Sequence, residues 1–427
     1  MSEWVHSNVG AVTLYQRAGG TPTATTDAYY GGEIPFVTIE DITNGTRYLD
    51  KTVKNLSELG LRTSAAWLVK EPHVLYSMYA TVGKPIVNRI ACATNQAIIA
   101  LKASEAVEQD FLFYQLLFIR PQVYKFTSQT TQSNLNASSV RKLPIAYPKS
   151  RATQRKIASI LSTIDTAIEQ TEALIEKYQH IKAGLMHDLF TRGVLPNGQL
   201  RPPREQAPEL YQETAIGWVP REWQYELLDN LSHRGSGHTP NKDHPEYWNG
   251  GIKWVSLADS NKLDQLYISD TELEISHKGI VNSSAVLHPA GIVVLSRDAG
   301  VGKSAITTEP MAVSQHFMCW KCDQKMDNHF LYYWLQFNKR TFENIAMGST
   351  ILTIGLPYFK RLRIACPVEL AEQQAIAKKL KSADTRIIAM RDHLAKLRKQ
   401  KLGLMQDLLT GKVPVKADAE NPELVGA

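Results

Sequence analysis

The chain has little of what marks several protein classes. Only four cysteines occur in 427 residues, too few for a disulfide framework, which indicates a reducing compartment. No apolar run approaches the roughly 18 residues that a membrane span needs; the strongest candidate, Phe111–Ile119, ends at Arg120 and Pro121. The amino terminus lacks a signal-peptide pattern, so we expect a cytoplasmic protein.

Charge of either sign is not in large excess. Lysine and arginine number 48 against 42 acidic residues, which gives a net charge of +6. With 43% hydrophobic and 21% charged residues, the composition is typical of a folded protein of two to four domains. The mild basicity permits a nucleic-acid partner but does not by itself indicate one.

What the chain does contain is an internal repeat. Lys182–Val194 (KAGLMHDLFTRGV) reappears as Lys401–Val413 (KLGLMQDLLTGKV), half the chain further on. We call the separation from Lys182 to Lys401 the repeat offset, and Leu143–Pro148 matches Leu362–Pro367 at the same offset. Each copy is long enough to bury its own core, so the repeat predicts duplicated domains and a pseudo-two-fold molecule rather than a solenoid.

Each copy begins with a mixed region and ends in a helix. Residues 1–150 alternate short β-rich runs with helical stretches such as Asp110–Ile119, which predicts an α+β domain. The helical segments carry a seven-residue apolar repeat over five heptads. One position of the repeat and the position four residues later are filled by Ile157, Ile164, Thr171, Tyr178, Leu185 and by Leu161, Ile168, Ile175, Lys182, Leu189 in the first copy, and by Ile376, Ala383, Met390, Leu397, Leu404 and by Leu380, Ile387, Leu394, Lys401, Leu408 in the second.

These two helical segments are expected to pair with each other. Each should extend over about 38 residues, or about 57 Å at 1.5 Å per residue, and five continuous heptads exceed one face of a domain of this size. A Pro-rich linker follows the first helix, and in an antiparallel pair this linker reaches the second domain without running back along the whole helix. We therefore expect an antiparallel coiled coil that separates the two α+β domains.

Several phrases of the second copy carry a family resemblance. They are IGWVPREW at Ile216–Trp223, WVSLAD at Trp254–Asp259, SRDAGVGK at Ser296–Lys303, and Glu372-Gln373 at the start of the helix. Together with the duplication and the heptads, they make the chain resemble the specificity subunit of type I restriction-modification systems. The first copy departs from the pattern, with Tyr79 matching Asp298, Thr81 matching Gly300 and Thr153 matching Glu372.

The resemblance implies a non-catalytic DNA reader that serves phage defence. Two target-recognition domains would each bind half of an asymmetric, bipartite site in double-stranded DNA. The helices would set the spacing and dock two methyltransferase subunits, and through them two restriction subunits. Cofactors would belong to the partners: S-adenosylmethionine to the methyltransferase, ATP and Mg to the restriction subunit. The implied division is residues 1–150, recognition domain 1; 151–192, central helix; 193–215, linker; 216–368, recognition domain 2; 369–412, C-terminal helix; 413–427, tail.

Candidate DNA contacts are donor-rich side chains expected on loops, because base edges are read by such groups. Lys84 and Lys303 follow glycine turns that could approach a phosphate, although a plain hairpin turn fits these residues equally well. The complete set is Arg47, Tyr79, Thr81, Lys84, Gln129, Thr131 and Asn134 in the first copy, and Arg297, Asp298, Lys303, Gln315, Ser349 and Thr350 in the second.

Catalytic and metal sites are not expected in this chain. It has no Asn-Pro-Pro-Tyr phrase, no glycine-rich cofactor loop of the required spacing and no nuclease constellation. His316, Cys319 and Cys322 have metal-ligand spacing, but alanines occupy the three matching positions of the first copy, so a buried strand with incidental cysteines is the better interpretation. Two alternatives stay open: a specificity factor of another phage-defence methyltransferase system, and a coiled-coil protein adaptor.

Overall fold

The computed structural model describes residues 3–126, 134–347 and 352–416, and the chain divides into two compact units. Unit 1 is Met1–Ala173 with Asp392–Ala427, and unit 2 is Leu174–Arg391. Each unit therefore holds one α+β domain, the adjoining part of the helix that follows it, and the end of the helix from the other copy. In the described part of the chain, no helix has the length and apolarity that a membrane span requires.

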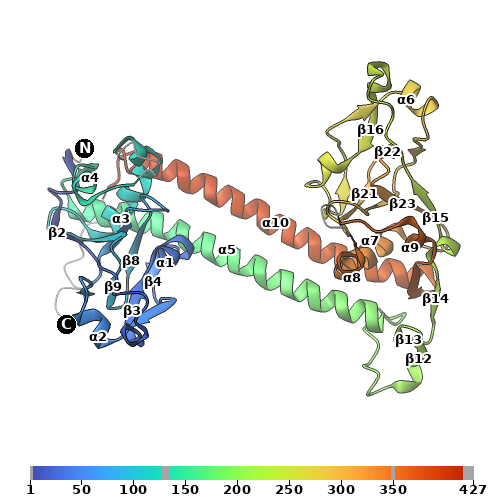
Figure 1. Ribbon diagram of the computed structural model, residues 1–427, viewed down its shortest axis with the longest axis horizontal. Helices are drawn as coiled ribbons and strands as arrows, with labels where there is room; N and C mark the ends of the chain where they lie inside the picture. Colours follow the sequence, from blue (N-terminus) through green and yellow to red (C-terminus); the bar gives the residue numbers. More distant parts are fainter. Residues whose placement is uncertain (1–2, 127–133, 348–351, 417–427) are drawn as a thin grey trace. The chain divides into compact units, whose positions relative to one another are not determined.

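The domain of unit 1 contains two sheets and a strand pair (Figure 1). A five-stranded sheet has the order β2-β10-β7-β8-β4, a four-stranded sheet has the order β5-β3-β9-β6, and β1 pairs with β11. The strands are β1 (Trp4–Asn8), β2 (Thr13–Ala18), β3 (Tyr30–Val37), β4 (Tyr48–Leu49), β5 (Lys54–Leu56), β6 (Leu68–Val69), β7 (Val74–Ser77), β8 (Pro85–Asn88), β9 (Cys92–Thr94), β10 (Ile98–Ala103) and β11 (Pro144–Pro148). The helices before the long one are α1 (Ile39–Asn44), α2 (Glu58–Arg62), α3 (Gln109–Ile119) and α4 (Ala137–Arg141).

The domain of unit 2 has the same topology. Its sheets have the orders β15-β23-β20-β21-β17 and β18-β16-β22-β19, β14 pairs with β24, and an additional hairpin joins β12 to β13. The strands are β12 (Tyr211–Thr214), β13 (Gly217–Pro220), β14 (Trp223–Leu227), β15 (Ser232–Ser236), β16 (Trp248–Val255), β17 (Tyr267–Ile268), β18 (Glu274–Ile275), β19 (Leu287–His288), β20 (Val293–Ser296), β21 (Ser304–Thr307), β22 (Met311–Val313), β23 (Phe317–Cys322) and β24 (Arg363–Pro367). Its helices are α6 (His277–Val281), α7 (Asn328–Phe337), α8 (Lys339–Ile345) and α9 (Leu356–Lys360).

Even an irregularity of pairing is repeated. In β3, both Tyr30 and Ile34 align with Leu56 of β5, and in β16 both Trp248 and Ile252 align with Ile275 of β18. A bulge of this kind bends a strand locally and is a built-in feature rather than a defect. The duplication predicted from the sequence is therefore confirmed at the level of strand register.

A helix from the domain and a long helix form the main core of each unit. In unit 1, α3 packs with β7, β10 and the start of α5 (Arg151–Arg192), and Met405, Leu408 and Leu409 complete that core. In unit 2, α7 packs with β20, β23 and the start of α10 (Leu370–Leu408), and Leu189 and Phe190 complete it. Each long helix therefore ends inside the core of the other copy's domain.

The two long helices pack antiparallel within each unit. In unit 1, Asp165 and Glu172 of α5 pair with Lys401 and Arg398 of α10, respectively. In unit 2, Lys182 of α5 pairs with Asp384 of α10. As residue numbers rise along α5, the numbers of the residues paired with them on α10 fall. The predicted fold class, two α+β domains with a pair of long antiparallel helices, is confirmed.

The linker after α5 is anchored in unit 2. Gly193 ends the helix with φ +65°, a left-handed conformation that glycine adopts without strain. Arg201 is 2% exposed, and its Nη1 donates to Glu372 Oε1 at 2.5 Å. The hairpin β12–β13 spans the boundary at residue 216 that the sequence suggested between linker and domain.

Candidate functional site

The hairpin turns after β7 and β20 hold predicted DNA contacts in both copies. Their backbones adopt left-handed conformations at equivalent places, with φ +55° at Ala80 and +77° at Gly83, and +46° at Ala299 and +86° at Gly302. Non-glycine residues rarely adopt positive φ, and such conformations cluster at tight turns and functional sites. Two alanines in this conformation, separated by the repeat offset, therefore mark one specialised turn used twice.

The lysines that close these turns bond to the protein itself. Lys84 Nζ donates to Thr43 O at 2.9 Å and to Gly45 O at 2.7 Å. Lys303 Nζ donates to Ser260 O at 3.0 Å and to its Oγ at 3.1 Å. Burial, followed by the charge of Arg120, lowers the pKa of Lys84. An ammonium has three donors. Among the described residues, each lysine uses two of them to hold its turn to an earlier segment of the chain, so a third N–H can meet another acceptor.

In unit 2 the turn carries a charged cluster. Asp298 is 6% exposed, and its Oδ2 lies 2.7 Å from His316 Nδ1, while its Oδ1 accepts a hydrogen bond from Thr353 Oγ1. Arg297 donates through Nε to Gln315 O at 3.1 Å. The buried aspartate therefore holds the cluster together, while the side chain of Gln315 is exposed and that of His316 is half-buried.

In unit 1, Met78 and Tyr79 take the places of Arg297 and Asp298, so the same turn lacks this charged cluster. Tyr79, which matches Asp298, is 39% exposed. Thr81 is half-buried, and its hydroxyl contacts that of Thr43. The two copies therefore present different chemistry from an equivalent backbone.

One polar pair beside each turn is common to both copies. Thr21 Oγ1 donates to Gln96 Oε1 in unit 1, and Thr239 Oγ1 donates to Gln315 Oε1 at 2.5 Å in unit 2. Both glutamines are exposed. Gln96 was not among the residues chosen from the sequence, although it lies one repeat offset before Gln315 and could have been identified in this way.

The backbone that follows the predicted contacts Asn134 and Thr350 hydrogen-bonds beside these turns. Leu135 N donates to Met78 O at 2.9 Å, and Ile354 N donates to Arg297 O at 2.9 Å. Asn134 is half-buried. Four predicted contacts lie outside the described residues: Gln129, Thr131, Ser349 and Thr350. We call this region the polar edge of each unit, formed by Thr21, Tyr79, Thr81 and Gln96 in unit 1 and by Thr239, Arg297, Asp298, Gln315 and Thr353 in unit 2.

Arg47 does not lie on an exposed loop, as the sequence interpretation assumed. It is 4% exposed, its Nη2 lies 2.7 Å from Asp110 Oδ2, and its guanidinium lies 4.6 Å from the ring centroid of Tyr48 and 5.1 Å from that of Tyr114. Arg47 is therefore held inside unit 1 by an ion pair and cation–π contacts.

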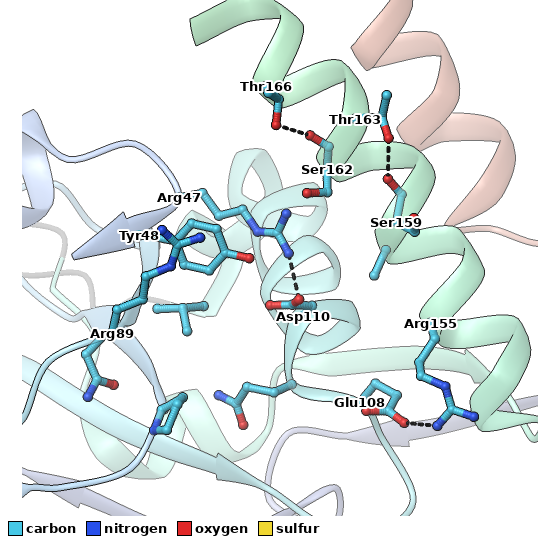
Figure 2. A pocket seen from close by; sticks show the side chains of 15 residues that line it. Arg47, Tyr48, Arg89, Glu108, Asp110, Arg155, Ser159, Ser162, Thr163 and Thr166 are labelled. Carbon is cyan, nitrogen blue, oxygen red and sulfur yellow. Dashed lines mark hydrogen bonds and ion pairs between the residues drawn. The ribbon is translucent and has the colours of Figure 1, made fainter. Parts of the chain in front are cut away.

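Beside Arg47 is a hollow of about 740 Å³ between the domain of unit 1 and α5 (Figure 2). Arg155 pairs with Glu108 at 2.8 Å on its floor, and Arg89 stacks on Tyr48 with 3.5 Å from guanidinium carbon to ring centroid. The wall formed by α5 carries mainly hydroxyls: Ser159, Ser162, Thr163 and Thr166.

In unit 2, side chains bond to one another across the corresponding place. Tyr267 matches Tyr48 and Lys381 matches Ser162 at the repeat offset. Lys381 Nζ donates to Tyr267 Oη at 2.8 Å, and that hydroxyl lies 2.7 Å from His329 Nε2. The two domains therefore differ where they meet their helices on this side as well as at the polar edge.

None of the predicted seam residues of the helices is exposed. Ile157 and Leu161 lie in the core formed with α3, and Ile376 and Leu380 lie in the core formed with α7, so these four pack against their own domains. Those buried are Ile157, Leu161, Ile175, Leu189, Ile376, Leu380, Ile387, Leu397 and Leu408, and those half-buried are Ile164, Ile168, Tyr178, Leu185, Met390, Leu394 and Leu404.

The residues with metal-like spacing do not converge. Cys319 and Cys322 lie on β23, and Cys319 is 1% exposed with its Sγ 3.5 Å from His288 Nε2. His316 contacts Asp298 instead. Within the described residues no group of three potential ligands is close enough to hold a metal ion.

The sequence analysis named Gln373 only as part of a family phrase, and it missed both the buried role of this glutamine and its counterpart Gln154. Gln154 Nε2 donates to Ala106 O and Pro148 O, and its Oε1 accepts from Glu108 N at 2.7 Å. Gln373, one repeat offset further on, makes the equivalent bonds, including one accepted from Asp327 N at 2.9 Å. Each glutamine therefore ties the start of a long helix to its domain.

The family assignment follows from both copies together. The model of the family described as "Type I restriction modification DNA specificity domain" matches residues 1–178 and 220–399. The chain belongs to this family. Its members supply sequence recognition without catalysis, and the chain is the DNA specificity subunit of a type I restriction-modification system.

Individual relatives agree over most of the chain. The type I restriction enzyme MjaVIII specificity subunit of Methanocaldococcus jannaschii is 22% identical, with 97% of this chain and 94% of that protein covered. The HindI specificity subunit of Haemophilus influenzae is 22% identical, covering 78% and 84%. The crystal structure of the type I S subunit from M. genitalium has a TM-score of 0.59 at 12% identity, covering 95% and 96%, which supports the fold of this specificity subunit.

Proposed function

We propose that each α+β domain of this specificity subunit binds one half of a bipartite site in double-stranded DNA, and that the polar edges make the contacts. The observation that carries the proposal is that one backbone turn occurs in both units with different side chains. Equivalent placement with different chemistry is what two domains need in order to read two different half-sites.

The residues suit these roles individually. Gln315 presents an amide that can both donate and accept, as adenine readout requires. Arg297 is of the donor type suited to guanine, but its side chain is 17% exposed and its Nη1 donates to Ile354 O at 3.1 Å, so only its remaining N–H groups could reach a base. Tyr79 and Thr81 offer one aromatic face and one hydroxyl in unit 1. The remaining N–H of Lys84 and of Lys303 fits a phosphate contact, which would position the turn without reading sequence.

The paired helices are proposed to set the gap between half-sites and to dock two methyltransferase subunits, through which two restriction subunits join. The complex would act in the cytoplasm, with S-adenosylmethionine bound by the methyltransferase and ATP with Mg by the restriction subunit. A helix rises about 1.5 Å per residue, so insertion of one heptad into each helix would lengthen the spacer by about 10 Å, or about three base pairs.

Methylation mapping tests the proposal. The chain is co-expressed with its methyltransferase, and methylated positions are located across a host genome. A split, asymmetric motif with one gap length is the expected result. A stable complex that methylates a continuous motif, or none, would contradict recognition by two separate domains.

A further inference from the structure

Two three-residue clusters join the domains to the helices. In unit 1, Asp165 Oδ2 accepts a hydrogen bond from Tyr114 Oη at 2.7 Å, and its Oδ1 lies 2.5 Å from Lys401 Nζ. In unit 2, Asp384 Oδ2 accepts from Tyr333 Oη at 2.9 Å, and its Oδ1 lies 2.5 Å from Lys182 Nζ. We call these joint 1 (Tyr114, Asp165, Lys401) and joint 2 (Tyr333, Asp384, Lys182).

The joints are built from the internal repeat but exchange one member. The two tyrosines, the two aspartates and the two lysines are each separated by the repeat offset. In each joint the tyrosine comes from a domain, the aspartate from the helix that follows that domain, and the lysine from the other copy's helix. A single carboxylate therefore connects three elements, and the two halves of the chain are tied reciprocally.

The two aspartate carboxylates are largely buried away from water, so losing their partners would be costly. The side chains of Asp165 and Asp384 are 12% and 17% exposed, and the side chain of each lysine is 22% exposed. A charge removed from water is strongly disfavoured without partners. Burial, followed by the neighbouring aspartate, raises the pKa of Tyr114 and of Tyr333, so both hydroxyls stay protonated and donate.

The joints penalise the alternative helix registers. An antiparallel pair with a heptad pattern can slide by one heptad and keep its apolar seam. A slide of one heptad in one direction would place both lysines opposite alanines, Ala158 and Ala377. The same slide would place both aspartates opposite apolar side chains. A slide of one heptad in the opposite direction would place Lys401 opposite Glu172, but it would also place Lys182 opposite Arg391 and both aspartates opposite leucines. In neither case do both carboxylates keep a cation.

Apolar contacts also hold the helix ends, through Met405 and Leu408 in unit 1 and Leu189 and Phe190 in unit 2. Apolar contacts depend on area and shape and are not directional, whereas an ion pair completed by a hydroxyl is satisfied in one arrangement. Polar residues within an apolar seam are known to specify register at the expense of stability.

We infer that the two joints are positioning devices: they select one register of α5 against α10 and one seat for each domain, and thereby fix the gap between the two half-sites. This inference rests on the proposed function, because the gap exists only if both domains read DNA. The six residues do not contact DNA themselves and act through the elements they join.

The test replaces joint 1 by apolar groups in the full chain, co-expressed with its methyltransferase. The variant Tyr114→Phe, Asp165→Leu, Lys401→Leu removes all three polar partners together, so no buried charge is left. We expect the complex to assemble with an unfolding temperature equal to or above wild type, and methylation to spread to sites whose gaps differ from the wild-type gap. An unchanged gap at unchanged efficiency would overturn the inference.

Charge reversal gives an independent test of the pairing. Asp165→Lys alone places two lysines together and should cause loss of methylation at the wild-type gap, while addition of Lys401→Asp should restore it. Failure of the double variant to restore the wild-type gap, when the complex assembles, would count against pairing as the selective feature.

The matched control is Arg398→Ala, which breaks the ion pair with Glu172 between the same two helices, 2.6 Å long with the arginine side chain 63% exposed. It should leave the gap unchanged, and a broadened gap in this variant would overturn the assignment to the joints. A wild-type chain that methylates no split motif would refute the proposed function. A wild-type split motif with an unaltered gap in the apolar variant would refute only the joints.

Discussion

The polar edges and the joints are two regions of the same duplicated fold, and they have diverged to different extents. At the joints, Tyr114, Asp165 and Lys401 each have an identical counterpart in the other copy. At the polar edges, Tyr79 corresponds to Asp298, and only the Thr–Gln pair is shared. A contact between domain and helices must meet the same geometry twice, whereas a reading surface must differ if the two half-sites differ.

The largest effect is expected where both copies are most alike, in the core. Leu161 and Leu380 occupy equivalent helix positions and are 0% exposed. Replacing either by alanine should cost about 2–5 kcal/mol of unfolding free energy, because a cavity remains. Urea unfolding of Leu161→Ala and Leu380→Ala should give similar losses. A loss in only one variant would show that the two cores are not energetically equivalent.

Breaking one joint by a single substitution should come next. Lys401→Met and Lys182→Met each leave an aspartate without its cation. The cost should be about 2–3 kcal/mol, below the roughly 3–5 kcal/mol of a fully buried pair because the lysines are partly exposed. Thermal unfolding checks this, and Arg398→Ala serves as the comparison, with an expected loss below about 1 kcal/mol. Equal losses in the three variants would contradict a special role for the joints.

Substitutions at the polar edge should separate recognition from stability. Gln96→Ala and Gln315→Ala should each change the unfolding free energy by less than about 0.5 kcal/mol, yet weaken DNA binding by about 1–3 kcal/mol if the amide reads a base. Methylation mapping of each variant should show relaxed specificity in one half of the motif and not in the other. A uniform loss over all sequences would instead indicate a phosphate contact.

A smaller difference should come from pH. Burial lowers the pKa of His73 in unit 1 and of His288 in unit 2. The unfolded chain then binds more protons than the native chain below about pH 6.5, so stability should fall as the pH drops through that value. Urea midpoints at about pH 7.5 and about pH 5.5 measure this fall. His288→Asn should reduce the fall, and an identical fall in the variant would exclude this histidine as a contributor.

Much of the fold could be predicted because repetition and periodicity are local signals. The repeat offset and the heptads predict duplicated domains and two long helices without knowledge of any contact. The candidate site was harder to predict. Arg47 was chosen for its type, and its burial against Asp110 depends on α3, which follows much later in the chain. Gln96 could have been found by its offset from Gln315, and Lys182 and Lys401 stand out in the heptads, but the sequence gives no signal for the aspartate that each lysine meets.

By itself, the sequence determined that the protein is a duplicated α+β chain with paired helices and a resemblance to specificity subunits, since these properties are written in spacing and pattern along the chain. Tertiary structure alone decided which charges are shared between copies and which side chains remain outward. Lys182 and Lys401 look like flaws in an apolar seam until folding places Asp384 and Asp165 opposite them. Such pairings join residues from different halves of the chain, and only the packing of helices against domains brings them together.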